Sequence, residues 1–316
     1  MKYLVTGGAG FIGSNIVEEL VRRGESVRVL DNFSTGKREN LAEFLDGIEL
    51  IEGDIRSYHI VREAVEGIDV VLHQAALPSV PRSVRDPITS NEVNVSGTLN
   101  LLDVAKEAKV KRIVFASSSS VYGDNPELPK HEGMIPKPLS PYAVSKLAGE
   151  QYCGVFSRIY GLETIALRYF NVFGPRQDAN SQYSAVIPRF IAAMLNDKQP
   201  IIYGDGTQSR DFTFVDNVVE ANMLASMAMC ETGMVMNCAC HDRITLNQLI
   251  ENINSVLGKN IKPAYHDARP GEIKHSYASV RLAQESISYE PKVKFPDGLL
   301  KTIEWHKSRL NITSRR

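Results

Sequence analysis

Four glycines between a short β-branched run and an amphipathic stretch place the strongest constraint on the fold of this chain. The segment YLVTGGAGFIGSNIVEEL can be read as GxGxxG, with Gly8, Gly10 and Gly13, or as GxxGxxG, with Gly7, Gly10 and Gly13. One glycine permits a tight turn, a second lets a pyrophosphate approach the backbone, and the last lets the helix pack on the strand. The N-terminus of that helix faces the anion. The segment therefore predicts the strand–turn–helix unit of a dinucleotide-binding sheet.

Strand-like and helix-like segments alternate through the first half of the chain. The expected strands are Tyr3–Thr6, Val27–Leu30, Ile48–Glu52, Val70–His73, Ile113–Ala116 and Thr164–Leu167. The expected helices are Phe11–Arg23, Ile60–Val65, Val93–Ala108 and Tyr142–Tyr160. This alternation, with continuous apolar strands, predicts an α/β fold built on a Rossmann-type parallel sheet with helices on both faces.

After about Asn171 the regular alternation of strands and helices ends, and the expected strands and helices become short. We expect residues 1–171 to form the dinucleotide-binding Rossmann domain. Residues 172–316 are expected to form mainly a smaller C-terminal α/β substrate lobe, with some segments returning to the sheet. Because open parallel sheets bind ligands at the carboxyl edge, the substrate is expected between the two parts.

One carboxylate at the end of the second expected strand indicates which dinucleotide binds. Asp31 stands where an acid accepts hydrogen bonds from the adenosine ribose and repels the additional phosphate of NADP, which favours NAD. Lys37 and Arg38 lie nearby and weaken this preference. The alternative is that Asp31 caps a loop.

The overall charge and the cysteines exclude several classes of partner. The chain has 36 basic and 37 acidic side chains, and this balance gives no field for binding nucleic acid or an anionic membrane. No apolar run approaches the ~20 residues that span a bilayer. Cys153, Cys230, Cys238 and Cys240 lack the paired spacing of a zinc site, so no metal is expected. Few cysteines and no signal-peptide pattern indicate a cytoplasmic protein.

A tyrosine and a lysine in SPYAVSK have the spacing of a proton-transfer pair. Tyr142 and Lys146 are four residues apart, so a helix places them on one face. A neighbouring ammonium, together with the positive nicotinamide of bound NAD⁺, would lower the pKa of the phenol so that it can accept a hydroxyl proton. Ser118, at the end of the fifth expected strand, supplies a hydroxyl at the same edge. Because it is one of four consecutive serines, the choice is uncertain by one position.

Together these residues resemble the extended short-chain dehydrogenase/reductases and, within them, the UDP-sugar 4-epimerases, the UDP-N-acetylglucosamine 4-epimerases most closely. The resemblance extends over almost the whole chain. Its ordered motifs are TGGAGFIGS, LDNFSTG, GDIRS, LHQAA, NVSGTLNLLDVA, SSSSVYG, SPYAVSK, LRYFNVFGPRQ, YGDGTQSRDFTFVDN and ARPGE.

The resemblance implies a role for each matching position. The catalytic trio would be Ser118, Tyr142 and Lys146. Contacts to NAD would also come from Gly7, Gly10, Phe11, Ile12, Gly13, Asp31, Asn32, Asp54, Ile55, Ala75 and Ala76. Contacts to the substrate would also come from Asn171, Ala185, Val186, Tyr203, Arg210, Arg269, Glu272 and Ser276. In this scheme Asn171, Arg210 and Arg269 hold the diphosphate, a task that suits guanidinium groups in a nearly neutral chain.

The residues after the catalytic serine indicate which reaction follows oxidation of the sugar. Dehydratases and decarboxylases of this scaffold carry an acid just after that hydroxyl, whereas this chain has Ser119 and Ser120. Elimination is therefore disfavoured, and a 4-epimerase that forms a transient 4-keto sugar is expected.

The resemblance also bears on the sugar. Ser276 matches a position beside the C2 substituent where a small residue leaves room for an N-acetyl group. Pro78 matches neither the glycine nor the lysine of the two family branches, so activity on UDP-glucose and UDP-galactose is not excluded. UDP-N-acetylglucosamine and UDP-N-acetylgalactosamine are the best candidates, and UDP-glucose or UDP-glucuronate the alternatives. Ser117–Ser119 could supply the polar contact that a uronate needs.

Two other classes of protein are alternatives to an epimerase, and one partner is expected. A nucleotide-sugar oxidoreductase would release reduced cofactor or altered product, and a non-catalytic NAD-binding sensor would have little need for Tyr142 and Lys146. The expected partner is a second copy of the chain. The helical patterns near Val93–Ala108 and Pro141–Tyr160 resemble those that form a four-helix bundle between subunits in this family, although they could equally just cover the sheet.

Overall fold

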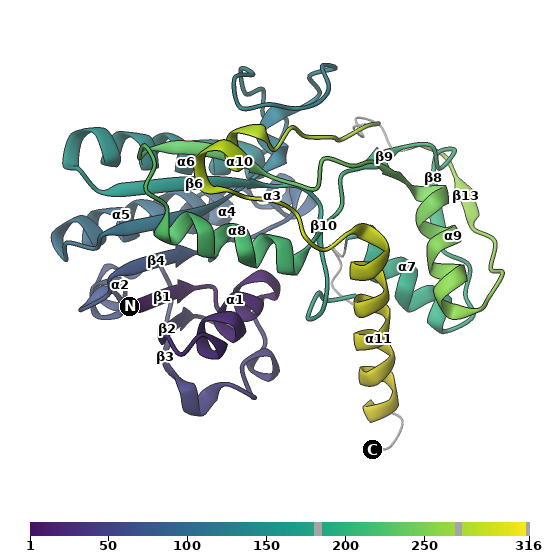
Figure 1. Ribbon diagram of the computed structural model, residues 1–316, viewed down its shortest axis with the longest axis horizontal. Helices are drawn as coiled ribbons and strands as arrows, with labels where there is room; N and C mark the ends of the chain where they lie inside the picture. Colours follow the sequence, from purple (N-terminus) through teal and green to yellow (C-terminus); the bar gives the residue numbers. More distant parts are fainter. Residues whose placement is uncertain (180–184, 269–273, 314–316) are drawn as a thin grey trace.

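The protein is described by a computed structural model, which describes residues 1–179, 185–268 and 274–313, with side chains described as far as residue 309. A seven-stranded sheet forms its larger part (Figure 1). The strand order is β11-β6-β5-β4-β1-β2-β3, and every neighbouring pair is parallel. The strands are β1 (Lys2–Thr6), β2 (Ser26–Asp31), β3 (Ile48–Glu52), β4 (Val70–His73), β5 (Arg112–Ser118), β6 (Glu163–Tyr169) and β11 (Met234–Cys238).

This strand order confirms the predicted Rossmann-type fold. The direction of progression along the sheet reverses between β1 and β4, so a crevice opens beyond the carboxyl ends of these two strands. The six expected strands agree with β1 to β6 to within two residues at each end, and β5 and β6 extend further, to Ser118 and Tyr169. The strand β11 was not among the expected strands.

Helices cover both faces of the sheet. On one face α1 (Phe11–Arg22) and α8 (Val215–Met227) pack against each other and share an apolar cluster with the strands. On the other face α2 (Tyr58–Val65), α5 (Gly97–Glu107) and α6 (Pro141–Tyr160) share a second cluster. The short helices α3 (Val80–Arg85) and α4 (Pro87–Asn91) pack against α6.

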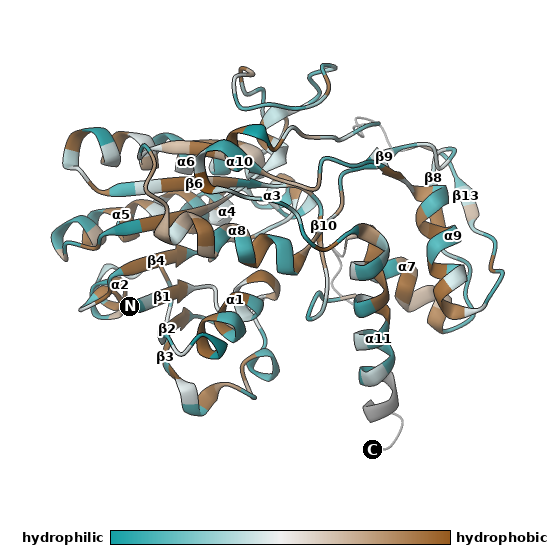
Figure 2. Ribbon diagram, in the orientation of Figure 1, coloured by the Kyte–Doolittle hydropathy of each residue, from teal (hydrophilic) through white to brown (hydrophobic). Residues whose placement is uncertain are grey.

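The remaining elements form a second group beside the sheet, on the right in Figure 1. It contains α7 (Val186–Leu195), α9 (Leu246–Leu257) and α11 (Phe295–Thr313). Short strands pair within it: β7 (Val172–Phe173) with β10 (Thr213–Phe214), β8 (Ile201–Tyr203) with β13 (Ala264–His266), and β9 (Ser209–Arg210) with β12 (Ile244–Thr245). In Figure 2, α1, α9 and α11 show hydrophobic and hydrophilic bands, in keeping with one buried face.

Two features depart from the simple pattern read along the chain. The helix expected from Val93 becomes a regular α-helix only at Gly97, because residues Glu92–Ser96 form a π-helical turn. The strand β11 and the helix α8 come from beyond residue 171 and yet belong to the large sheet and its cover, as does α10 (Arg281–Ile287), which packs on β11. Short 3₁₀ turns occur at Arg38–Asn40, Leu45–Gly47 and Ser119–Tyr122.

Candidate active site

The glycine loop between β1 and α1 leaves no room for a side chain at Gly7 or Gly13. Gly7 has a φ of +68°, and a Cβ placed on it would lie 2.7 Å from the backbone of Ala75. A Cβ on Gly13 would lie 2.1 Å from the carbonyl oxygen of Gly7. The N-cap of α1 is Gly10, which has no side chain to cover the helix end. This end of α1 is therefore open to an anion such as a pyrophosphate.

A cavity of about 80 Å³ extends from this loop along the carboxyl edge of β1, β2 and β4. Most of the residues expected to bind the cofactor line it: Gly7, Asp31, Asn32, Asp54, Ile55, Ala75 and Ala76. Phe11 and Ile12 are the first two residues of α1. The residues present thus fit an extended dinucleotide that runs from the adenosine end at β2 and β3 towards β4.

Asp31 is held in this cavity wall by backbone hydrogen bonds. Its carboxylate accepts hydrogen bonds from the N–H groups of Ala9 (2.9 Å) and Phe33 (2.8 Å). Burial raises the pKa of Asp31, and these hydrogen bonds act in the opposite direction. Asn32 donates to Oδ2 of Asp54 at 2.8 Å. An acid therefore stands at the end of β2, where it can accept a hydrogen bond from a ribose hydroxyl and repel a 2′-phosphate.

The two basic residues near Asp31 have partners elsewhere. Lys37 lies 3.2 Å from Asp178, and Arg38 lies 2.5 Å from Glu52. The Arg38 guanidinium also stacks 4.0 Å from the ring centre of Phe33. Both charges are thus already compensated within the protein, which reduces their weight as ligands for the phosphate of NADP.

Tyr142 and Lys146 lie on the face of α6 that is turned to the sheet. Ser140 caps this helix by accepting a hydrogen bond from the N–H of Ala143 (3.1 Å), and Pro141 is its first residue. The Lys146 ammonium lies 6.0 Å from the ring centre of Tyr142 and donates to the carbonyl oxygen of Ala116 (2.8 Å). Since Lys146 is only 4% exposed, its charge is almost completely removed from water.

Ser118 is the serine that lies beside Tyr142. It ends β5, and its hydroxyl forms a hydrogen bond with the Tyr142 side chain and accepts one from the N–H of Ser120 (3.2 Å). Ser117 points to the opposite side of the strand, as the alternation of side chains in a strand requires, and donates to the buried Glu150. The structure thus distinguishes between serines that the sequence could not separate.

Burial dominates the ionisation of the pair in the protein without its cofactor. Burial raises the pKa of Tyr142, and the hydrogen bond from Ser118 acts in the opposite direction. Burial also lowers the pKa of Lys146 to about 8, with Cys153 and Glu150 acting in the opposite direction. The expected lowering of the phenol pKa concerns the protein with NAD⁺ bound, where the nicotinamide adds a positive charge, and it stays a prediction.

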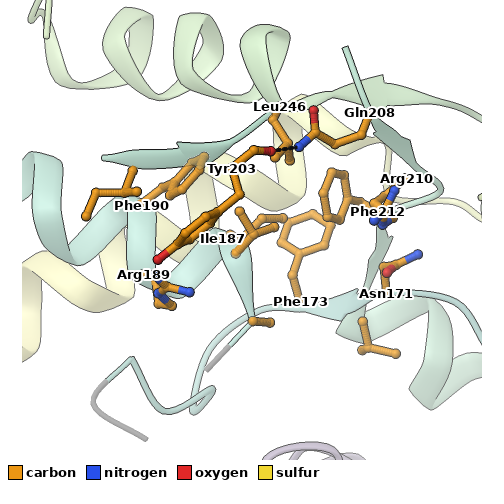
Figure 3. A pocket seen from close by; sticks show the side chains of 14 residues that line it. Asn171, Phe173, Ile187, Arg189, Phe190, Tyr203, Gln208, Arg210, Phe212 and Leu246 are labelled. Carbon is orange, nitrogen blue, oxygen red and sulfur yellow. Dashed lines mark hydrogen bonds between the residues drawn. The ribbon is translucent and has the colours of Figure 1, made fainter. Parts of the chain in front are cut away.

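Two larger cavities meet at Asn171 and Arg210. The first, of about 270 Å³, lies beside α7 (Figure 3). Figure 3 shows Tyr203, Phe190 and Arg189 at one end of this cavity, with Asn171 and Arg210 at the other. The expected substrate contacts that line it are Asn171, Ala185, Val186, Tyr203 and Arg210.

The second cavity, of about 320 Å³, lies between the serine turn and the strand segment of Ser276. Asn171 and Arg210 line both cavities. The side chain of Arg210 is held by hydrogen bonds from Nη1 to the carbonyl oxygens of Ser209 (2.9 Å) and Lys274 (3.1 Å). A cation and an amide thus stand between an aromatic-lined cavity and one lined by both polar and apolar side chains. This arrangement suits a nucleoside on one side, a sugar on the other and a diphosphate between them.

Several residues of these cavities were not among the sequence predictions. The aromatic walls Phe173, Phe190 and Phe212 line the first cavity, and Lys130, Leu139 and His275 line the second. Phe173 and Phe212 lie within the quoted motifs, so their positions beside Asn171 and Arg210 were a usable signal. Lys130 and Leu139 come from the long segment before α6, which no motif covered. Arg269 and Glu272 lie outside the described residues.

Comparison with known proteins places the chain in a family. Residues 3–239 match the NAD dependent epimerase/dehydratase family. The chain belongs to this family. A putative UDP-glucose 4-epimerase of Methanocaldococcus jannaschii is 38% identical over 307 residues, which cover 96% of this chain and 98% of the relative.

Solved structures of epimerases share the fold of this family member. A UDP-N-acetylglucosamine 4-epimerase from Methanobrevibacter ruminantium M1, in complex with UDP-N-acetylmuramic acid, is 43% identical with a TM-score of 0.94, and the match covers 98% of each chain. A UDP-glucuronic acid 4-epimerase from Bacillus cereus, in complex with UDP-glucuronic acid and NAD, is 33% identical with a TM-score of 0.90, covering 98% of this chain and 100% of that one.

The family confirms that the protein is an NAD-dependent enzyme with a Rossmann-type sheet, as predicted. Within the described ranges, no helix is both long and apolar enough to cross a membrane. Among the same residues, no group of three or more His, Cys, Asp or Glu side chains could hold a metal ion.

Proposed function

We propose that this epimerase/dehydratase family member is an NAD-dependent 4-epimerase of UDP-sugars, acting on UDP-N-acetylglucosamine and UDP-N-acetylgalactosamine. The observation that carries the proposal is the shared wall of the two substrate cavities. Asn171 and Arg210 line both, and the second cavity reaches the serine turn that follows Ser118. The nucleoside diphosphate would stay anchored while the sugar occupies the second cavity.

The residues at the end of β5 and on α6 suit reversible oxidation at C4. Tyr142 would remove the proton of the 4-hydroxyl, and Ser118 would bridge the sugar oxygen and the phenol. Lys146 would place a positive charge beside the phenol and help to hold the cofactor. Bound NAD⁺ would supply the hydride acceptor for oxidation at C4 and the hydride donor for the reverse reaction, so it would be regenerated in each cycle. Asn171, with Arg210, would hold the diphosphate while the keto sugar turns over.

The remaining positions would bind the cofactor or the nucleotide. Gly7, Gly10, Phe11, Ile12 and Gly13 would hold the pyrophosphate, and Asp31, Asn32, Asp54, Ile55, Ala75 and Ala76 the adenosine side and the wall beside it. Ala185, Val186, Tyr203, Arg269 and Glu272 would contact the nucleotide of the substrate.

The second cavity supports epimerisation rather than elimination. Among the described residues that line it there is no aspartate or glutamate. Ser119 and Ser120 occupy the wall beside the catalytic hydroxyl, and the nearest basic groups there are Lys130, Arg210 and His275. Loss of water or carbon dioxide beside the ketone needs an acid or base of suitable pKa, which these serines cannot provide.

The choice of sugar rests on the small residue at one wall of this cavity. Ser276 lines it together with the apolar residues Val80 and Leu139, which are exposed at its mouth. This combination leaves space and an apolar surface for the methyl of an N-acetyl group. UDP-glucose is the alternative, because a cavity large enough for an N-acetyl group also accepts a sugar that lacks this group. UDP-glucuronate is a further alternative. Ser117 is buried against Glu150 and does not line the cavity, but Ser119, Ser120 and the basic residues Lys130, Arg210 and His275 do, and they could contact a carboxylate.

A substrate panel tests the proposal. The purified protein is incubated with NAD⁺ and with UDP-N-acetylglucosamine, UDP-glucose or UDP-glucuronate, and the products are resolved by proton NMR. We expect galacto-configured product without accumulation of free NADH. Growth of NADH absorbance would instead indicate an oxidoreductase, and an unchanged configuration of every sugar would indicate a non-catalytic NAD-binding protein. Preference for UDP-glucose or UDP-glucuronate would correct the sugar and leave the 4-epimerase in place.

We also propose a homodimer formed through α5 and α6, and a cytoplasmic location. α6 exposes a row of apolar side chains, Val144 (52%), Val155 (45%) and Ile159 (66%), on the side away from the sheet. α5 packs beside it, so two copies related by a twofold axis would form a four-helix bundle. Sedimentation analysis should show a dimer, and Ile159→Glu should give a monomer. The location is supported by four free cysteines, as expected in a reducing compartment.

A further inference from the structure

A buried ion pair joins the catalytic helix to the sheet behind the active site. Glu150 lies on α6 four residues after Lys146 and eight after Tyr142, so all three side chains share one face of the helix. Arg168 of β6 donates from Nε to Oε1 of Glu150 (2.8 Å) and from Nη2 to Oε2 (2.7 Å). The two side chains are 4% and 0% exposed for Arg168 and Glu150. This bidentate pair therefore fixes the register of α6 on β6.

The same carboxylate also holds the strand that carries the catalytic serine. Ser117 donates its hydroxyl proton to Oε1 of Glu150 at 2.5 Å. In the sheet, Ser117 stands opposite Arg168, and Ser118 stands opposite Tyr169. Because Ser117 and Ser118 point to opposite faces of β5, the bond to Ser117 fixes the direction in which Ser118 projects.

The other side of Arg168 reaches the wall of the second substrate cavity. Its guanidinium lies 4.6 Å from the ring centre of Tyr122, and the Tyr122 hydroxyl donates to Oδ1 of Asn237 on β11 at 2.7 Å. Tyr122 ends the 3₁₀ turn that begins at Ser119, and it lines the cavity. One ion pair thus contacts the helix, the strand and the turn that together build the catalytic edge.

Stability alone is a weak reason for such a pair. Replacement of a buried ion pair by apolar residues of similar volume is often neutral or stabilising, because both charges must leave water. The side chains of Glu150 and Arg168 are 0% and 4% exposed, and their carboxylate and guanidinium groups are bound to each other, so neither is assigned a contact with substrate or cofactor. The pair instead restricts how α6, β5 and the Ser119–Tyr122 turn can be placed, because bidentate hydrogen bonds form in only one relative orientation of their two side chains.

We propose that Glu150 and Arg168 are positioning residues for the 4-epimerase reaction: their ion pair, extended by Ser117 and Tyr122, holds Ser118 and the Tyr142–Lys146 face of α6 in the geometry that proton transfer requires. This inference rests on the proposed function. Small displacements matter here, because a misplacement of about 1 Å at a reacting centre costs about 10²-fold in rate.

Glu150 also has an electrostatic effect on Lys146. The charged or titratable groups that face Lys146 are Tyr142, Glu150 and Cys153 from α6 and His73 from β4. Burial holds the pKa of His73 at about 3, so that residue is neutral. Glu150 is thus the carboxylate that helps to keep the lysine protonated. Its removal should lower the pKa of Lys146 further, and activity should then be lost at a lower alkaline pH.

Three variants and a matched control test the proposal. Glu150→Gln keeps the shape of the side chain and the oxygen that accepts from Ser117, but it removes the negative charge. Arg168→Lys keeps the positive charge but cannot form the bidentate pair. Ser117→Ala removes one hydroxyl and leaves no buried charge unpaired. The control is Glu163→Gln, which breaks the 2.6 Å ion pair of Glu163 with Arg112 between the same two strands, at their opposite ends. For each NAD-loaded protein we would measure kcat, KM, the pH profile and hydrogen exchange.

We expect kcat per NAD-loaded site to fall about 10- to 100-fold in Glu150→Gln and Arg168→Lys, and severalfold in Ser117→Ala, because the groups are misplaced rather than lost. KM should stay within about twofold, and the alkaline limb of Glu150→Gln should move to lower pH. Exchange should rise in residues 117–122 and 142–150. The control should change none of these.

Each outcome decides between support and refutation. Folded variants with the kcat, pH profile and exchange of Glu163→Gln would overturn the positioning role, whatever their loss of thermal stability. If the two charge variants do not fold, Ser117→Ala decides, because it leaves the ion pair intact. If the wild-type protein epimerises no UDP-sugar, the proposed function fails, and the exchange measurement still supports or overturns the positioning role by itself.

Discussion

Replacing Lys146 by methionine tests whether catalysis in this protein depends on a destabilising buried charge. The side chain is 4% exposed, and its ammonium donates a hydrogen bond of 2.8 Å to the carbonyl oxygen of Ala116. Methionine has a similar length and flexibility, so it can follow the same path between α6 and β5 without a charge. The variant should therefore be inactive and yet more stable.

The magnitude follows from the pKa of the lysine. Burial lowers it from 10.5 to about 8. Each pKa unit corresponds to about 1.4 kcal/mol, so keeping the ammonium in the folded protein costs about 3 kcal/mol below pH 8. Loss of the hydrogen bond to Ala116 offsets about 1 kcal/mol of this. We expect Lys146→Met to raise the free energy of unfolding by about 2 kcal/mol at pH 7.

The pH dependence provides the sharper test. Between pH 8 and 10.5 the folded wild-type protein has lost the Lys146 proton while the unfolded chain still binds it, so the cost disappears as the pH rises. The advantage of the variant should shrink over this window and turn into a disadvantage of about 1 kcal/mol above it, because the neutral lysine still donates its hydrogen bond to Ala116. Tyrosines and cysteines titrate in both proteins, so their contributions cancel in the difference between the two free energies of unfolding.

The assay is urea denaturation of NAD-free wild type and variant at pH 7 and near pH 10, because bound cofactor would add stability of its own. Lys111→Met is the control, since Lys111 is 68% exposed and pairs with Asp69 at the surface. Activity should fall by at least about 10²-fold in Lys146→Met and stay normal in the control. A variant less stable than wild type at pH 7, or a difference that does not change with pH, would refute the reasoning.

Three further outcomes can be checked with simple variants. Tyr142→Phe should keep NAD binding, measured by release of the cofactor from denatured protein, and lose at least about 10²-fold in turnover; a near-normal rate would exclude Tyr142 as the base. Gly13→Ala should unfold at a lower temperature by calorimetry, since its Cβ would lie 2.1 Å from the Gly7 carbonyl oxygen. In Gly10→Ala the Cβ would lie 3.2 Å from the same oxygen, so this variant should keep the fold and bind NAD more weakly. Ser276→Tyr should abolish activity on UDP-N-acetylglucosamine and spare any activity on UDP-glucose, measured by NMR with both substrates.

Local pattern was enough to predict six of the seven strands of the large sheet and the position of the glycine loop. The strands β1 to β6 are rich in apolar and β-branched residues, and the glycine loop favours its own conformation, so both could be predicted from neighbouring residues. The pairing of Tyr142 with Lys146 needed only the period of a helix. Such features depend on interactions within one or two turns of the chain.

Other features depend on contacts between distant segments. Alternation along β5 separates Ser117 from Ser118, but only the position of α6 decides which of them meets Tyr142. The meeting of Asn171 with Arg210 requires the pairing of β7 with β10, between which the described residues form the helix α7 and the strands β8 and β9. The raised pKa of Tyr142 reflects burial, which composition does not reveal.

The apolar cluster that contains Val5 and Val29 also contains Val218 of α8 and Leu299 of α11. Part of the cover of one sheet face, beside α1, is thus supplied by chain that follows the substrate-facing loops. A fragment ending at residue 171 would leave that part of the face exposed to water and would tend to associate with other chains. Nucleotide capture and sugar capture therefore share one folding unit, and truncation from the carboxyl side should abolish both together instead of leaving a minimal dinucleotide-binding module.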